Sequence, residues 1–206
     1  MIMDMRLTSF VSVAALGMCL ADARAAETPG LDPEGYIIDW IMLAPIPLPA
    51  GRPAADLILA EQIPGEAALK PKAGDTLALR GKEWTWRQIT ATNHYFDFNA
   101  QLKSQHDHVA GFMVTYIECD VERPGTILTV GSNDQSRIYF NGVDIYAVTE
   151  ARPLALDSDK GRVTLKKGVN VIVFKVINEQ NSWQGSIRLT DKTGAPLKDV
   201  KIKVAP

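Results

Sequence analysis

Alternation of apolar and polar residues with a period of two dominates the chain from Asp75 onward, and helical periodicity is scarce. Such alternation is typical of strands whose two faces meet different surroundings. The pattern predicts strands over residues 75–81, 82–90, 108–119, 126–132, 136–140, 143–148, 162–168, 170–178, 182–191 and 197–204. Turn dipeptides separate several of these runs: Pro124-Gly125, Asn141-Gly142, Lys167-Gly168 and Thr193-Gly194. The sequence therefore predicts an all-β protein, an antiparallel sandwich or barrel.

The alternation also predicts which side chains face the interior. Ile138 and Phe140 share one face of their strand, and Tyr139 takes the other. The Asn141-Gly142 dipeptide that follows is the strongest short hairpin signal, and it predicts a two-residue turn of type I′. We expect this hairpin to present Ile138 and Phe140 to the core.

Two later runs carry further information about burial. The run 170–178 (NVIVFKVIN) is apolar on nearly every position except Lys175, which predicts a central strand covered on both faces. Trp183 has the same parity as Ile187 and Leu189, which favours a place in the core over a ligand platform.

The chain before Asp75 follows a different pattern. Tyr36–Leu43 (YIIDWIML) is an apolar run, and Pro45, Pro47 and Pro49 follow it. Because proline cannot donate to a strand ladder, we expect the strand to leave the sheet at this cluster. Residues 52–73 carry little alternation and predict a long loop, with a short helix at 54–62.

Composition and charge limit the class of protein. The 206 residues are 46% apolar and 22% charged, with a formal net charge of −2. These values are typical of one soluble globular domain. The near-zero charge argues against a nucleic-acid partner, which calls for a basic excess or patch. No apolar run reaches the roughly 18 residues that predict a transmembrane segment.

The N-terminus has the features of a signal peptide. Leu7–Leu20 is an uncharged apolar stretch that follows Arg6, and Ala23-Arg24-Ala25 is an A-x-A cleavage pattern. The alternative is a buried first helix. We expect cleavage near Ala25, so that 1–25 is the signal peptide and 26–206 is a single β-sandwich domain with its core at about 36–205. This export predicts a secreted or periplasmic location.

The cysteines fit this prediction. Met18 precedes Cys19, where a lipoprotein signal requires a small residue, so the sequence argues against a lipoprotein. Removal of residues 1–25 leaves Cys119 alone, and one cysteine cannot form an intrachain disulfide. Cys119 ends an apolar run and is expected to be a buried small hydrophobe.

Several segments in order resemble a family of exported bacterial modules. The segments are GSNDQSRIYFNG (131–142), Arg152 in a loop, and VTLKKGVNVIVFKVINEQNSWQGSIRLT (163–190). Upstream, IIDWIMLAPIP (37–47) resembles the opening strand of these modules and YFDFNAQL (95–102) resembles a later segment. The chain is thus similar to jelly-roll, galactose-binding-like β-sandwich modules and to the sugar-binding domain of family 2 glycoside hydrolases.

The resemblance implies a non-catalytic β-sandwich, of a kind often appended to enzymes of glycan breakdown. Two positions depart from the family pattern. Asn133 replaces the first residue of an Asp-Asp pair, which removes a carboxylate, and Ala44–Pro47 replaces Gly-Pro-Phe-Pro. The resemblance therefore implies the fold more firmly than it implies an activity.

Asn133 and Asp134 are the candidate metal ligands. Ca²⁺ takes six to eight oxygen ligands, and Asp144 and the loop 157–159 offer further carboxylates if the loops converge. The alternative is a turn in which the Asn133 and Asp134 side chains cap local backbone groups. We favour the turn and keep Ca²⁺ as the testable exception; the sequence indicates no other cofactor.

Three histidines form a second candidate. His106 and His108 would point to one side of a strand, and with His94 they could supply three imidazoles to zinc. The SQHDHV segment is hydrophilic, however, and no glutamate is placed as a base. A solvated loop is the favoured interpretation.

The candidate ligand-binding residues are those suited to sugars. Sugar binding combines a flat aromatic ring with polar groups that contact hydroxyls. Trp84 and Trp86 share one face of their run, and Tyr139, Arg152 and Asn181 complete the set. The alternative is that these tryptophans pack into the core.

No catalytic motif is present: the sequence has no G-x-S-x-G, H-E-x-x-H, phosphate loop or dinucleotide fingerprint. We therefore expect a binding module and not an enzyme, with carbohydrate or a cell-envelope glycan as its ligand. The alternative function is a structural or protein-interaction module of the cell envelope without a small-molecule ligand.

Overall fold

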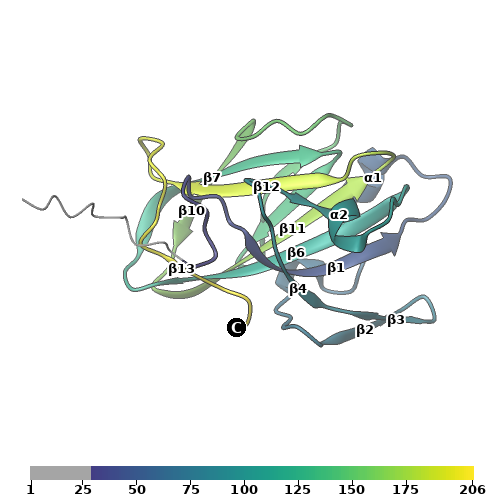
Figure 1. Cartoon of the computed structure of the whole chain (residues 1–206), viewed down its shortest axis with the longest axis horizontal. Helices are drawn as coiled ribbons and strands as arrows, with labels where there is room; N and C mark the ends of the chain where they lie inside the picture. Colours follow the sequence, from purple (N-terminus) through teal and green to yellow (C-terminus); the bar gives the residue numbers. More distant parts are fainter. Residues whose placement is uncertain (1–28) are drawn as a thin grey trace, which may run out of the picture.

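The computed structural model describes residues 29–206. Two antiparallel sheets pack face to face, and a separate two-stranded hairpin lies beside them (Figure 1). The elements are β1 (Asp39–Pro47), α1 (Ala54–Leu59), η1 (Glu66–Ala68), β2 (Thr76–Leu79), β3 (Lys82–Thr85), β4 (Arg87–Thr90), β5 (Phe96–Asp97), α2 (Phe98–Leu102), β6 (Val109–Cys119), β7 (Arg123–Asn133), β8 (Ser136–Phe140), β9 (Val143–Val148), β10 (Asp159–Leu165), β11 (Gly168–Asn178), β12 (Gln184–Thr190) and β13 (Lys201–Lys203).

The large sheet has seven strands in the order β4-β1-β6-β11-β8-β9, with β13 also paired to β6. The small sheet has the order β10-β7-β12-β5. β6 and β11 pair over their whole lengths, from Cys119 opposite Gly168 to Val109 opposite Asn178. The described strands therefore form an antiparallel β-sandwich, as the alternation predicted.

The core between the two sheets is built from the residues that alternation assigned to the inside. Ile138, Phe140 and Trp183 all lie in it. Trp183 stacks on Phe98 with ring centroids 4.1 Å apart, and its Nε1 donates to the Val176 carbonyl. The predicted core position of Trp183 is confirmed, and so is the inward face of the β8 hairpin.

A second apolar cluster covers the outer face of the large sheet. Ile41, Phe112 and Val173 lie on this face, and α1, the loop after it and the β2–β3 hairpin pack over them. β11 lies between β6 and β8 and is buried on both faces, including Lys175. The prediction of a covered central strand is confirmed, and the large sheet belongs to two cores.

Two strand predictions are wrong. β1 does not leave the sheet at the proline cluster, because a bulge between Leu43 and Ile46 takes up Pro45 and pairing with β6 resumes at Ile46 and Pro47. The run 82–90 is not one strand: it breaks at Trp86, so that β3 pairs with β2 while β4 pairs with β1.

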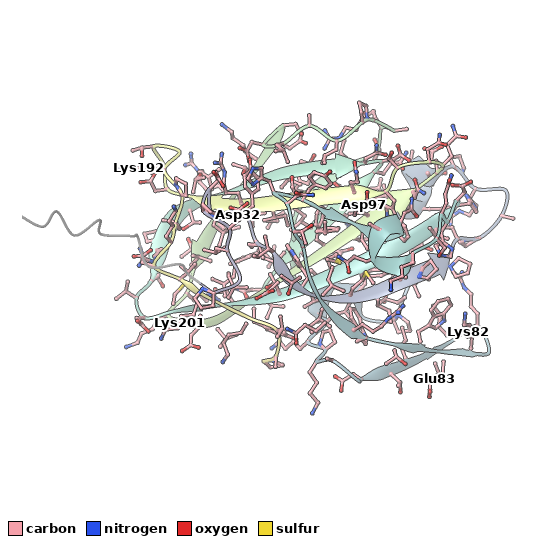
Figure 2. All side chains as sticks on the ribbon, viewed as in Figure 1. Asp32, Lys82, Glu83, Asp97, Lys192 and Lys201 are labelled. Atoms are coloured by element: carbon pink, nitrogen blue, oxygen red, sulfur yellow. The ribbon has the colours of Figure 1, made fainter. Side chains whose placement is uncertain are left out.

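The helices differ from expectation in length and in number. The predicted helix at 54–62 is present but shorter, as α1. α2 was not predicted, because its five residues are too few to show a helical period. Its start does carry a local signal: Asp97, labelled in Figure 2, accepts a hydrogen bond from the Ala100 N–H, as an N-cap residue does.

The turn between β8 and β9 has the predicted conformation. Asn141 and Gly142 both have positive φ, 51° and 83°, which is the property of a type I′ turn. The signal peptide and its cleavage near Ala25 fall outside the described residues. Within residues 29–206, none of the helices has the length and apolar character needed to cross a bilayer.

Candidate functional site

The aromatic side chains proposed as a sugar platform are buried. The exposed fraction is 9% for Trp84, 4% for Trp86 and 5% for Tyr139. All three belong to the cluster on the outer face of the large sheet. Neither tryptophan offers an open ring face to solvent, but Trp84 and Tyr139 each border a hollow of the surface.

The hollow beside Trp84 lies between β1 and the β2–β3 hairpin and has a volume of about 390 Å³. Figure 2 shows Lys82 and Glu83 on the part of the hairpin that projects from the sandwich. The other lining residues are Ala44 and Pro45 of β1, Thr85 at the end of β3 and Arg87 at the start of β4. An apolar floor with charged and hydroxyl groups around it is the usual form of a small-ligand site.

Trp84 has an unusual environment in this hollow. The Lys82 Nζ lies over its ring, 4.1 Å from the centroid. Its indole Nε1 is buried and has no hydrogen-bond partner among the described residues. Buried indole N–H groups usually have a partner, because a donor removed from water without one costs free energy. Trp84 therefore lines the hollow and also carries a buried donor without a partner among the described residues.

The hollow beside Tyr139 is smaller, about 250 Å³, and its polar groups are already paired. Tyr139 donates to Glu66 Oε1 at 2.7 Å, and Lys175 Nζ lies 2.5 Å from the same oxygen. The other oxygen of Glu66 accepts the Gln62 N–H, and Lys175 also donates to the Ala60 carbonyl. This set of contacts, the Glu66 cluster, ties the segment after α1 to the sheet.

Burial governs the ionisation of the Glu66 cluster. Burial lowers the pKa of Lys175, and the Glu66 carboxylate opposes that effect. Burial, followed by the hydrogen bond to Glu66, raises the pKa of Tyr139. Because each group has its partner in place, the cluster is a structural tie and leaves no donor or acceptor unpaired toward a ligand.

Arg152 lies in a different network, at the small sheet. Its Nη2 donates to Ser132 Oγ and Tyr146 Oη, both at 3.2 Å, and it forms an ion pair with Asp159. Burial would raise the pKa of Asp159, but the hydrogen bonds from Arg152, Ser158 and Tyr146 outweigh it and the pKa is lowered. Arg152 is thus engaged in joining β7, β9 and β10.

Asn133 and Asp134 lie where β7 turns into β8, and their polar groups bind the neighbouring backbone. Asp134 Oδ2 accepts the Glu179 N–H at 2.9 Å, and its carbonyl accepts the Ser132 hydroxyl. The Asn133 amide, in the orientation that satisfies both of its ends, donates to Asp134 Oδ1 and to the Ser182 carbonyl. Burial raises the pKa of Asp134.

The other carboxylates considered for Ca²⁺ have separate partners. Asp144 pairs with Arg137, Asp157 with Arg188, and Asp159 with Arg152. The arrangement of Asn133 and Asp134 is that of a corner that orders the β7–β8 and β11–β12 loops.

Asn181 lies in the β11–β12 loop and serves the local backbone there. Its carbonyl accepts the Asn99 amide at 2.7 Å, and its N–H donates to Asp107 Oδ1. The five predicted ligand-binding residues thus divide among three places: Trp84, Trp86 and Tyr139 on the outer face of the large sheet, Arg152 at the small sheet, and Asn181 in this loop.

The three histidines do not converge. His106 Nε2 faces Ser104 Oγ at 2.7 Å, and His108 Nε2 faces the Pro49 carbonyl at 3.2 Å. His94 instead lies with Asp32 and Glu34, which were not among the predicted residues. Because Asp32 and Glu34 precede the first strand in a short turn, no periodicity marked them, and only the fold brings His94 to them.

Comparison with known proteins gives no assignment of the site. No protein-family model matches the chain, and no curated protein matches it either.

Proposed function

We propose that the chain is an exported, non-catalytic binding module of the jelly-roll, galactose-binding-like type, with carbohydrate or a cell-envelope glycan as its ligand. The binding site in this proposal is the hollow beside Trp84. The antiparallel sandwich and the order of the segments that resemble this family support the module type.

The observation that carries the proposal is the open hollow of about 390 Å³ lined by Trp84, whose buried Nε1–H has no partner among the described residues. A small rotation of the indole into the hollow would let this donor meet a sugar hydroxyl, and the C–H face of a pyranose suits the apolar floor formed by Ala44, Pro45 and Trp84. A ligand that approaches the ring takes the place that the Lys82 ammonium now occupies.

The rim of the hollow also suits a polyhydroxy ligand. Lys82, Glu83, Thr85 and Arg87 are exposed around it. Their donors and acceptors provide directional contacts to hydroxyl groups, which fix the orientation of a ligand in a mostly apolar site. The Glu66 cluster in the hollow beside Tyr139 already has its polar groups paired, so the hollow beside Trp84 is the better site.

A glycan-array screen of the purified protein tests the proposal, followed by titration of the glycans that bind. The variant Trp84→Phe keeps the apolar bulk and removes the N–H donor. A hydrogen bond contributes about 0.5–1.5 kcal/mol, so the expected loss of affinity is roughly two- to twelvefold. Arg87→Ala is expected to weaken binding as well.

Trp86→Phe is the matched control, because Trp86 is buried in the same cluster and does not line the hollow. Its affinity is expected to equal that of the wild type. An array on which no glycan binds, or a Trp84→Phe protein that binds as well as the wild type, overturns the proposal and favours the structural or protein-interaction module.

A further inference from the structure

Three side chains with metal-ligating atoms converge near the start of the described chain. Asp32 and Glu34 lie on the turn before β1, and His94 lies on the loop between β4 and β5, sixty-two positions from Asp32. His94 Nδ1 is 2.5 Å from Asp32 Oδ2 and 3.7 Å from Glu34 Oε2. The three atoms all lie within 4.8 Å of one another, so small side-chain movements allow all three to contact one ion.

The carboxylate of Asp32 is held in a fixed orientation. Its Oδ1 accepts the backbone N–H groups of Glu34 at 3.0 Å and Tyr36 at 2.9 Å, which leaves Oδ2 directed at His94. The turn that carries it is closed by the hydrogen bond from Asp32 N to the Tyr36 carbonyl and is joined to the small sheet by the Tyr36–Arg188 bridge. Metal-ligating carboxylates are commonly oriented by such second hydrogen bonds.

The imidazole of His94 is also positioned by its surroundings. Its ring lies against the Tyr36 ring, with centroids 5.1 Å apart. Tyr36 is held in turn, since its hydroxyl donates to Asp157 Oδ2 and the Arg188 guanidinium lies over its ring, 4.8 Å from the centroid.

We propose that Asp32, Glu34 and His94 bind one divalent transition-metal ion, with Zn²⁺ as the best-fitting example. One imidazole nitrogen with two carboxylate oxygens is a ligand set that zinc accepts at about 2.0–2.2 Å, whereas Ca²⁺ prefers oxygen ligands alone. Three protein ligands leave a fourth position of the tetrahedron for water, and the exposed His94 and Glu34 side chains keep that position open to solvent.

Binding of the ion replaces the proton that His94 Nδ1 shares with Asp32 Oδ2, and these two atoms move apart by about 1 Å to take up tetrahedral separations. The site is separate from the hollow beside Trp84: Figure 2 shows Asp32 on the loop near β12 and Lys82 on the projecting hairpin. The metal proposal is therefore independent of the proposed glycan binding.

The test is a calorimetric titration of metal-free protein with ZnCl₂ at pH 7.5, repeated with CoCl₂ to record the visible absorption of the bound ion. We expect one ion per chain, and a cobalt spectrum of a four-coordinate nitrogen and oxygen site. His94→Ala and the exposed Glu34→Gln are each expected to weaken zinc binding by about tenfold or more. Neither side chain belongs to an apolar core cluster, so both variants are expected to fold.

His106→Ala is the matched control, because His106 lies on another loop and faces Ser104. Its zinc binding is expected to be unchanged. The proposal is overturned if the wild type takes up no stoichiometric zinc, or if His94→Ala and Glu34→Gln bind it as tightly as the wild type.

Discussion

At the scale of single residues, Lys175 is the side chain whose environment departs most from the ordinary. It lies on the central strand β11 and is fully buried, and its ammonium is 2.5 Å from the Glu66 carboxylate. Two charges removed from water lose their hydration, and their attraction compensates only while both are present. The ion pair therefore adds little to the stability of the fold, but the loss of either Lys175 or Glu66 leaves the other charge buried without a partner.

This dependence predicts a large effect of Lys175→Met. The variant leaves the Glu66 carboxylate buried without its counter-ion, although Tyr139 and Gln62 still donate to it. Removal of one partner of a buried pair costs about 3–5 kcal/mol. We expect a loss of this size in the free energy of unfolding, measured by urea denaturation followed by circular dichroism.

Two further variants serve as comparisons. The double variant Lys175→Met/Glu66→Leu is expected to recover most of the lost stability, because it removes both charges at once. Lys167→Met, at an exposed position next to β11, is expected to change stability by less than about 0.5 kcal/mol. A double variant no more stable than Lys175→Met alone would refute this account of the pair.

The sequence pattern predicted the burial of Lys175 but not its partner. The otherwise apolar run 170–178 predicted a covered strand, and a lysine buried in such a strand requires a partner. The partner lies 109 positions away, in a stretch without alternation that was assigned to a long loop. The local pattern predicts which face of the strand Lys175 takes. The identity of its partner depends on how the loop that carries Glu66 folds back on the sheet, which the local pattern does not contain.

At the scale of elements, close approach between layers is set by glycines that face aromatic rings. A Cβ on Gly111, near the start of β6, would lie 2.6 Å from the Trp183 ring and would also overlap the Phe98 ring. Those two rings stack on each other in the core. Gly111 therefore fixes how closely β6 approaches the stacked rings.

We predict that Gly111→Ala is destabilising for this steric reason. Its methyl group would displace Phe98 and Trp183 from their stacked positions, and overpacking of a core costs about 1–3 kcal/mol. Gly161→Ala, on β10, is the control, since its Cβ would meet Ile145 at an ordinary 3.4 Å. The measurement is the free energy of unfolding of each variant. Equal stabilities for the two alanine variants would contradict the close approach at Gly111.

The elements themselves were predicted where alternation was long and uninterrupted. β6, β8, β9 and β11 agree with the sequence pattern to within a residue or two. The failures occur where one residue changes the geometry: the bulge at Pro45 keeps β1 in the sheet, and the break at Trp86 sends the two halves of one run to different sheets. A period of two does not reveal either event, because alternation resumes beyond it.

At the scale of the whole molecule, the candidate site depends on a layer that alternation alone could not predict. Trp84 and Trp86 share one parity in the sequence, which does not distinguish an exposed platform from a face packed into a core. The packing of α1, its following loop and the β2–β3 hairpin over the large sheet makes a third layer and buries them. The hollow beside Trp84 exists because this third layer meets β1 at its edge.

The shared large sheet predicts that all three layers unfold together. Trp40 and Trp183 lie in the core between the sheets, and Trp84 and Trp86 lie in the outer cluster, so tryptophan fluorescence can follow each side. Because β6 and β11 contribute side chains to both cores, loss of one core exposes the other, and we expect a single cooperative transition.

The Trp84→Phe/Trp86→Phe variant reports on the inner core alone. Each protein is unfolded in urea and followed by both fluorescence and far-ultraviolet circular dichroism, and in each the two signals are expected to share one midpoint. A fluorescence change that comes earlier in the wild type alone would mean that the outer layer unfolds independently.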